Sequence, residues 1–144
     1  MRIATAIAAV VGIWAMASQE ASSQPLPLDI ADGTYLYGES PVAETLGATY
    51  FVFEVTDNTL AGVVYQPSSS FDCVYGTVTA DALNLTIVNA YDQSEWQHTV
   101  ALVPATTEIA SLNGTAPPPQ LEGMHAIRTI SELDQQLLAT CTQR

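Results

Sequence analysis

Short β-rich segments, separated by turn residues at intervals of about ten residues, constrain the fold of this chain more than any other feature. Two of them flank Thr56-Asp57-Asn58-Thr59, a turn sequence that predicts a β-hairpin. In a later segment Leu83, Leu85 and Ile87 alternate with polar residues, as in a strand with one buried face. The predicted strands are 34–38, 49–55, 60–66, 71–79, 83–88, 97–103 and 125–130. We therefore expect a mainly β domain, an antiparallel meander of about seven strands forming a small closed or nearly closed barrel.

The C-terminal segment breaks this pattern and predicts a helix. Ser131-Glu132-Leu133-Asp134 has the form of a capping box, in which the serine and the acid satisfy free backbone donors. The helix is expected over 132–140. Leu133, Leu137 and Cys141 are spaced by four residues and so lie along one stripe of the helix. This stripe is expected to pack on the outside or the open end of the barrel.

The chain has two cysteines, Cys73 and Cys141. Cys73 falls in a predicted strand, on the same face as Phe71 and Tyr75. Two cysteines in an exported protein are expected to pair, and a bridge across 68 residues stabilises a fold by roughly 4 kcal/mol in the loop-entropy model. The alternative is a redox-active thiol pair, but such pairs are usually close in sequence and near a cation. A structural disulfide is therefore the favoured interpretation.

The N-terminus is typical of a secretory signal peptide. Arg2 precedes an apolar run over 3–15, and Ala15-Met16-Ala17 fits a signal peptidase site, with cleavage after Ala21 as the alternative. A membrane-spanning helix needs about 20 apolar residues, more than this run supplies. We expect a signal peptide at 1–17, an extended lead-in at 18–31 and one domain at 32–144. The mature protein would have no membrane span and would be periplasmic or extracellular.

The charge balance excludes one class of partner. The chain has 15 Asp and Glu, 3 Arg and no Lys, which gives a net charge of −12. A polyanion is repelled by phosphate backbones, so nucleic-acid binding is not expected.

No residue set of this sequence matches a catalytic or metal-binding motif. Ser68-Ser69-Ser70 lies near Asp72 but lacks the Gly-x-Ser-x-Gly elbow, and neither His98 nor His125 is adjacent in sequence. Two separated histidines without a spare cysteine do not predict a zinc site. We expect no metal and no cofactor.

The aromatic residues other than Trp14 all lie between residues 35 and 96. They predict either a filled barrel core or the lining of a pocket at the mouth of a barrel, and a filled core is favoured because barrels of about eight strands are just filled by their own side chains. If there is a pocket, its predicted ligand-binding residues are Tyr35, Tyr37, Tyr65, Trp96 and His98.

Three stretches carry a resemblance to known proteins: Asp32-Gly33-Thr34-Tyr35-Leu36-Tyr37-Gly38-Glu39, Tyr50-Phe51-Val52-Phe53-Glu54-Val55, and Tyr65-Gln66-Pro67-Ser68-Ser69-Ser70-Phe71-Asp72-Cys73. With these stretches and the ending Leu138-Ala139-Thr140-Cys141-Thr142-Gln143-Arg144, the chain resembles uncharacterised small secreted β-rich proteins of cyanobacteria. The resemblance implies export and a small β-rich fold, and it carries no catalytic motif.

These observations favour an exported, non-catalytic binding or interaction module. The alternative is a lipocalin-like carrier of a small apolar or aromatic ligand, with such a ligand or a protein as partner. A hydrolase that uses paired carboxylates is a distant third hypothesis.

Overall fold

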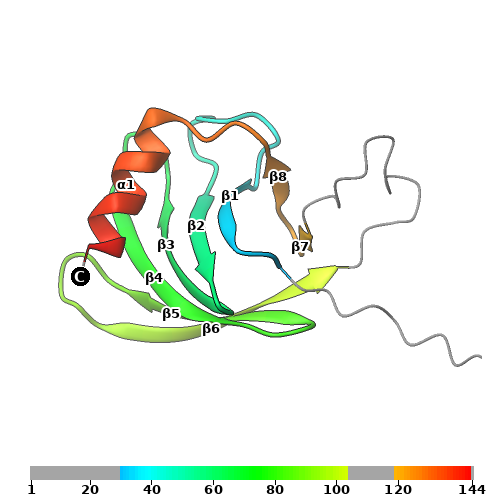
Figure 1. The fold of residues 1–144 in the computed structure, drawn as a ribbon. Coiled ribbons are helices and arrows are strands. Elements are labelled where there is room, and N and C mark those ends of the chain that lie inside the picture. Colours follow the sequence, from blue (N-terminus) through cyan, green and yellow to red (C-terminus); the bar gives the residue numbers. More distant parts are fainter. Residues whose placement is uncertain (1–29, 104–118, 144) are drawn as a thin grey trace, which may run out of the picture.

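The computed structural model describes residues 30–103 and 119–143, in which one antiparallel sheet curls into a nearly closed barrel with a helix on its outside (Figure 1). Its elements are β1 (Gly33–Gly38), β2 (Tyr50–Thr56), β3 (Thr59–Tyr65), β4 (Phe71–Val78), β5 (Ala82–Val88), β6 (Glu95–Val103), β7 (Gln120–Leu121), β8 (His125–Ile127) and α1 (Glu132–Thr142). The sheet order is β7-β6-β5-β4-β3-β2-β1-β8, and β7 also contacts β8. The predicted fold class is confirmed, whereas the predicted signal peptide lies outside the described residues.

The strands differ from the prediction mainly near the C-terminus. The strand expected over 125–130 is only β8, three residues long, because the chain then leaves β1 to reach the start of α1. The two-residue strand β7 was not expected, since a segment that short carries no periodic signal. β7 and β8 are joined by a turn in which Gly123 has φ +76°, a left-handed conformation that favours glycine.

The turn between β2 and β3 is the hairpin that the sequence predicts. Asp57 and Asn58 have φ values of 49° and 60°, as a type I′ turn requires, and Asp and Asn tolerate this conformation better than most residues. The Asp57 backbone N donates a hydrogen bond to Oδ1 of Asp32 at 3.0 Å, and the backbone N of Val78 donates to the Asn58 carbonyl at 2.9 Å. The turn is thus tied to the start of β1 and the end of β4.

The inside of the barrel is filled by side chains of its own strands. Phe53 lies at the centre of an aromatic stack, with ring centroids 4.5 Å from Phe51, 5.5 Å from Tyr35 and 5.8 Å from Tyr37. Gly62 pairs with Phe53 across the sheet, and a Cβ there would lie 2.5 Å from the Val52 carbonyl oxygen and 2.6 Å from the Phe53 Cβ, so only glycine fits at this position. The buried residues of this inner cluster are Ile30, Tyr37, Phe51, Phe53, Val55, Leu60, Val74, Val78, Leu83, Leu85, Ile87, Leu102 and Leu121.

A second cluster lies on the outside of the barrel, where α1 covers β2, β3 and β4 (Figure 1). The predicted disulfide is confirmed: Cys73 in β4 is bonded to Cys141 in α1, with their Cα atoms 5.5 Å apart. The buried residues of this outer cluster are Leu36, Tyr50, Val52, Val63, Tyr65, Cys73, Leu138 and Cys141.

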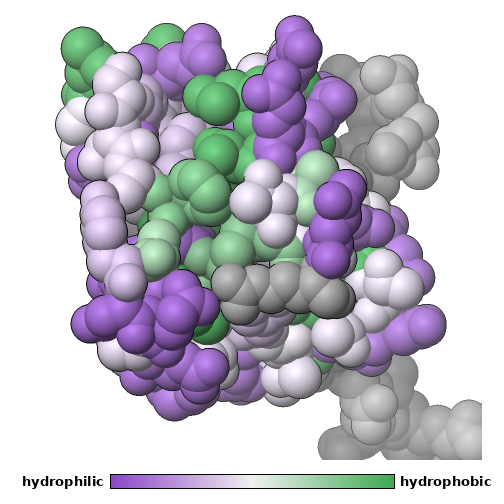
Figure 2. All heavy atoms as spheres, turned by 90° about the vertical axis from the view of Figure 1, so that its left-hand side faces the viewer, coloured by the Kyte–Doolittle hydropathy of each residue, from purple (hydrophilic) through white to green (hydrophobic). Residues whose placement is uncertain are grey.

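The helix turns a different face to the sheet than its apolar spacing predicts. Asp134, Leu138 and Cys141 are buried, whereas Leu137 is only partly buried and Leu133 is 38% exposed. The prediction was right for Cys141 and wrong for the leucines. The helix is rotated because Asp134, not Leu133, occupies the buried position of the first turn. Figure 2 views the side that carries α1 and shows hydrophobic atoms left visible among hydrophilic ones.

Asp134 has a hydrogen-bond partner for each of its buried oxygens. The predicted capping box is present: the Asp134 backbone N donates to Oγ of Ser131 at 3.1 Å, and the Ser131 backbone N donates to Oδ2 of Asp134 at 2.9 Å. The Tyr65 hydroxyl donates to the other oxygen, Oδ1. One carboxylate therefore both caps α1 and joins it to β3, which offsets the cost of burying it.

This packing predicts that Leu138 contributes much more stability than Leu133. Replacing Leu138 by Ala leaves a space in the outer cluster and should lower the free energy of unfolding by about 2–5 kcal/mol. Leu133→Ala, on the exposed side of the same helix, should change it by less than about 1 kcal/mol. Chemical denaturation of the two variants measures both effects. Equal losses would contradict the rotation of α1 described above.

Candidate ligand-binding site

Cavities occur where two short strands close the barrel, a region that we call the seam. β8 pairs with β1 only at Leu36–Gly38, and β7 pairs with β6 only at Leu102–Val103. In the described residues these strands have no further pairing with β1 or β6, and the seam is bordered by side chains from β1, β6, β7 and β8 and from the segment after β8.

The larger seam cavity has a volume of about 660 Å³, within the range of about 300–1,000 Å³ that is typical of small-molecule sites. Its apolar lining comes from Pro41, Val103, Leu121, Met124 and Ala126, and its polar lining from Gln120, Glu122, His125 and Arg128. A cavity with both kinds of lining fits a ligand that has an apolar body and a polar group.

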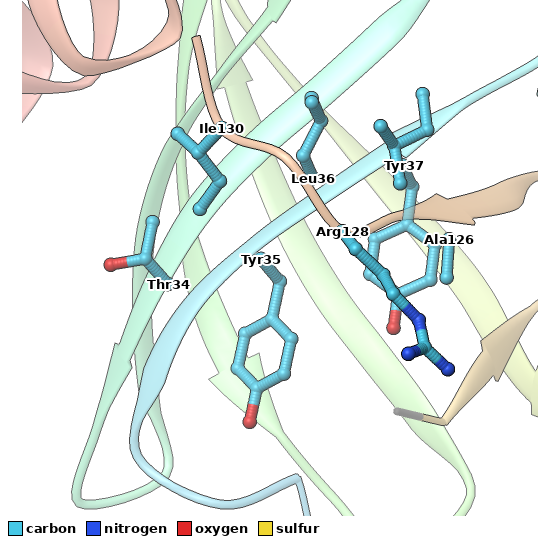
Figure 3. Close-up of a pocket in the computed structure, with 8 residues that line it drawn as sticks. Thr34, Tyr35, Leu36, Tyr37, Ala126, Arg128 and Ile130 are labelled. Atoms are coloured by element: carbon cyan, nitrogen blue, oxygen red, sulfur yellow. The ribbon is translucent and has the colours of Figure 1, made fainter. Parts of the chain in front are cut away.

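A smaller cavity of about 170 Å³ lies between β1 and the segment that runs from β8 to Ile130, and Figure 3 shows its lining. Tyr35 and Tyr37 project from β1, and the Arg128 side chain extends beside Tyr37. Ala126 and Arg128 line both cavities, so the two cavities are neighbours along β8 and the residues just after it. This cavity alone is smaller than a typical ligand site.

The seam carries an arginine in a strongly acidic protein. Arg128 is the one arginine within the described ranges, since Arg2 and Arg144 fall outside them. Its side chain and that of His125 are exposed and line the larger cavity. A guanidinium presents parallel N–H donors that match a carboxylate. Sequence reasoning missed both residues, although His125-Ala126-Ile127-Arg128 brings an arginine and a histidine together in a chain with few cations.

The five predicted ligand-binding residues do not form one site. Tyr35 and Tyr37 lie together on the smaller cavity, whereas Tyr65 is buried under α1 on the opposite face of the sheet. Trp96 and His98 pair with Ile87 and Leu85 and so face the inside of the barrel. They are nevertheless exposed, Trp96 by 43%, because β6 is near the end of the sheet. Binding by these residues stays a prediction.

The tyrosine hydroxyls already have protein partners. Tyr35 donates to the carbonyl of Ala31 at 2.6 Å, and Tyr37 donates to the carbonyl of Pro119 at 2.5 Å. Burial raises the pKa of Tyr37 and, with Asp32 nearby, that of Tyr35. Burial, and then the hydrogen bond to Asp134, raise the pKa of Tyr65. These groups therefore stay protonated at neutral pH and act first as structural donors.

The serine and acid residues considered for nucleophilic chemistry are not joined in the described part of the chain. Asp72 accepts a hydrogen bond from the backbone N of Ala90 at 2.9 Å, and Ser69 donates its backbone N to Gln66. No group of three or more His, Cys, Asp or Glu that could hold a metal occurs within 30–103 and 119–143. In the same ranges, no helix has the length and apolar character to cross a membrane.

The buried tyrosines predict a loss of stability at alkaline pH. The pKa of Tyr37 is raised above its ordinary value of 10.0, so the unfolded chain releases this proton at lower pH than the folded protein does. The free energy of unfolding should therefore fall as the pH rises above about 10.

Chemical denaturation of wild type, Tyr37→Phe and Tyr91→Phe checks this prediction. It is measured from about pH 8 to about pH 11, because an ordinary tyrosine has a pKa of about 10. Tyr37→Phe should flatten the pH dependence. Tyr91 is 82% exposed, so its variant should follow wild type. An identical slope in all three proteins would show that Tyr37 does not contribute.

Comparisons do not add a relative from which a site could be transferred. The chain matched no model of a protein family, no curated protein and no solved structure. The seam, where Arg128 and His125 line the larger cavity, is therefore identified as the candidate ligand-binding site from its geometry alone.

Proposed function

We propose that this protein is an exported, non-catalytic binding module that takes a small ligand with an apolar body and a carboxylate at the seam. The observation that carries the proposal is the larger cavity of about 660 Å³, whose lining combines Arg128 and His125 with apolar side chains. The chain as a whole has a net charge of −12 and repels anions, so a carboxylate would need a local positive group such as Arg128.

The apolar and the polar lining residues of the cavity would contact different parts of the ligand. Pro41, Leu121 and Met124 would cover the apolar body of the ligand, and methionine adapts to irregular shapes. Arg128 would bind the carboxylate through paired hydrogen bonds. Glu122 also lines this cavity, so a ligand hydroxyl or amine next to the acid would find an acceptor there.

A lipocalin-like carrier is the alternative, and it would hold its ligand within the barrel. Phe53, Leu60 and Leu83 fill that space with exposed fractions of 0–1%, which favours a site at the seam over a central one. A carboxylate-based hydrolase has less support, because Asp72 is already engaged with the Ala90 backbone and Asp134 with α1.

Export is the second part of the proposal. The disulfide between Cys73 and Cys141 supports a periplasmic or extracellular location, since such bridges persist in oxidising compartments. The predicted signal peptide at 1–17 and the resemblance to secreted cyanobacterial proteins point in the same direction. The N-terminus of protein recovered from its host, read by mass spectrometry, should lie after Ala17 or Ala21.

Calorimetric titration with decanoate and with decanol tests the ligand class. Decanoate should bind more tightly than decanol, because only the acid engages Arg128. Arg128→Gln should weaken decanoate binding by about tenfold or more, equivalent to about 1.4 kcal/mol, and leave decanol binding unchanged. His125→Gln should also weaken decanoate binding, because it removes an imidazole that lines the same cavity.

His98→Gln is the matched variant, a histidine on β6 that does not line either seam cavity. Equal affinity for acid and alcohol, unaffected by Arg128→Gln, would refute a carboxylate site at the seam. Loss of binding in His98→Gln alone would instead favour the Trp96 and His98 site that the sequence predicts.

A further inference from the structure

β6 has a long backbone edge that no strand of the described ranges covers. Its inner neighbour β5 pairs with it over Glu95–Ala101, whereas β7 pairs with its other side only at Leu102–Val103. Figure 1 shows β6 running along the outside of the sheet as far as the short contact with β7. A strand of this length with a free edge can accept another strand by main-chain hydrogen bonds.

The hydrogen bonds at the end of β6 show which backbone groups face outward. The Leu102 backbone N donates to the Asp81 carbonyl on the β5 side at 2.8 Å, and the Ala101 carbonyl accepts from the Glu122 backbone N on the β7 side at 3.0 Å. Successive residues of a strand point their N–H and C=O groups to opposite sides. The N–H and C=O groups of Glu95, Gln97 and Thr99 therefore point to the free edge.

The free edge lacks the features that usually prevent strands from pairing. It contains no lysine and no proline, and Glu95 is its one carboxylate. Trp96, 43% exposed, stands next to this edge on the inner side of β6. Proteins protect exposed edges with charges, proline or bulges, and an edge without them is prone to association.

We infer that β6 pairs antiparallel with β6 of a second copy of this chain, about a two-fold axis at Gln97. In that register Gln97 exchanges both backbone hydrogen bonds with Gln97 of the second copy, and Glu95 does so with Thr99 of the second copy. All of the outward groups at these three positions are then satisfied on both strands.

The side chains favour this register and this partner. Trp96 would lie opposite His98 of the second copy in a non-hydrogen-bonded pair, where side chains approach most closely. Glu95 would lie opposite Thr99, so no like charges face each other. Moving the two-fold axis by one residue, to His98, shifts the pairing by two residues. It would oppose the two His98 side chains and bring Glu95 to Ala101, whose carbonyl already accepts from Glu122. The strand is thus complementary to itself, as a two-fold interface requires.

This interface does not depend on ligand binding. Of the β6 residues only Val103 lines the larger seam cavity, and Val103 lies beyond the free edge. Two copies that each carry a charge of −12 repel one another at long range, and salt screens this repulsion. Dimerisation should therefore strengthen as the ionic strength rises, unlike the binding of a basic peptide.

Analytical ultracentrifugation of the full exported chain, from micromolar to millimolar concentration and at low and high salt, tests the inference. Wild type should show a monomer–dimer equilibrium. Gln97→Lys would place two like charges at the two-fold axis and should weaken the dimer by about tenfold or more. A non-specific association of acidic chains would instead be strengthened by the added positive charge.

Thr99→Pro removes an outward N–H and a side-chain hydrogen bond to Asn84, but no main-chain bond to β5, so the sheet should stay folded while the dimer is lost. Thr99→Ala keeps that N–H and should dimerise like wild type, and circular dichroism checks the fold of each variant. A wild-type protein that is monomeric throughout would overturn the inference, even if it captured a strand of another protein. A dimer unaffected by Gln97→Lys and Thr99→Pro would also overturn it, because it would use another surface.

Discussion

The central strands of this barrel are apolar on both faces, so they require a cover on each side. In β2 the four consecutive residues Tyr50–Phe53 are buried, and alternate ones belong to the inner and the outer cluster. The barrel itself covers the inner face, and α1 covers the outer one. The docking of α1 is therefore the constraint on which the rest of the structure depends. It is fixed at one end by Asp134 and Tyr65 and at the other by the disulfide between Cys73 and Cys141.

The same constraint limits where a ligand can bind. Three tyrosines hold segments outside the central sheet in place. The buried Tyr37 donates to Pro119 just before β7, the buried Tyr65 donates to Asp134, and the partly buried Tyr75 donates to the carbonyl of Cys141 at 3.0 Å. Their hydroxyls are committed to the fold, and the inner cluster fills the barrel. Arg128 and His125, by contrast, are exposed at the seam and line one cavity there.

Much of the fold could be predicted because it depends on local signals. Two of these signals, the turn at Asp57 and Asn58 and the cap at Ser131, involve only a few neighbouring residues. The third is the cysteine pair, whose residue type has one common role in an exported protein. The face of α1 could not be predicted in the same way. It is set by the contact of Asp134 with Tyr65, 69 positions away in the sequence. A pattern of apolar residues also does not predict that an aspartate is buried. The sequence also does not predict that Arg128 and His125 line the same cavity, because this depends on the register in which β8 pairs with β1.

Amide hydrogen exchange of a chain that lacks residues 132–144, with Cys73→Ser to remove the unpaired thiol, tests the role of α1 most directly. If α1 is the outer cover of the sheet, the amides of β2, β3 and β4 should exchange much faster than in the intact protein, and a hydrophobic dye should bind to the exposed outer cluster. Unchanged protection of these three strands, without dye binding, would show that the barrel is stable without the helix and would contradict this account.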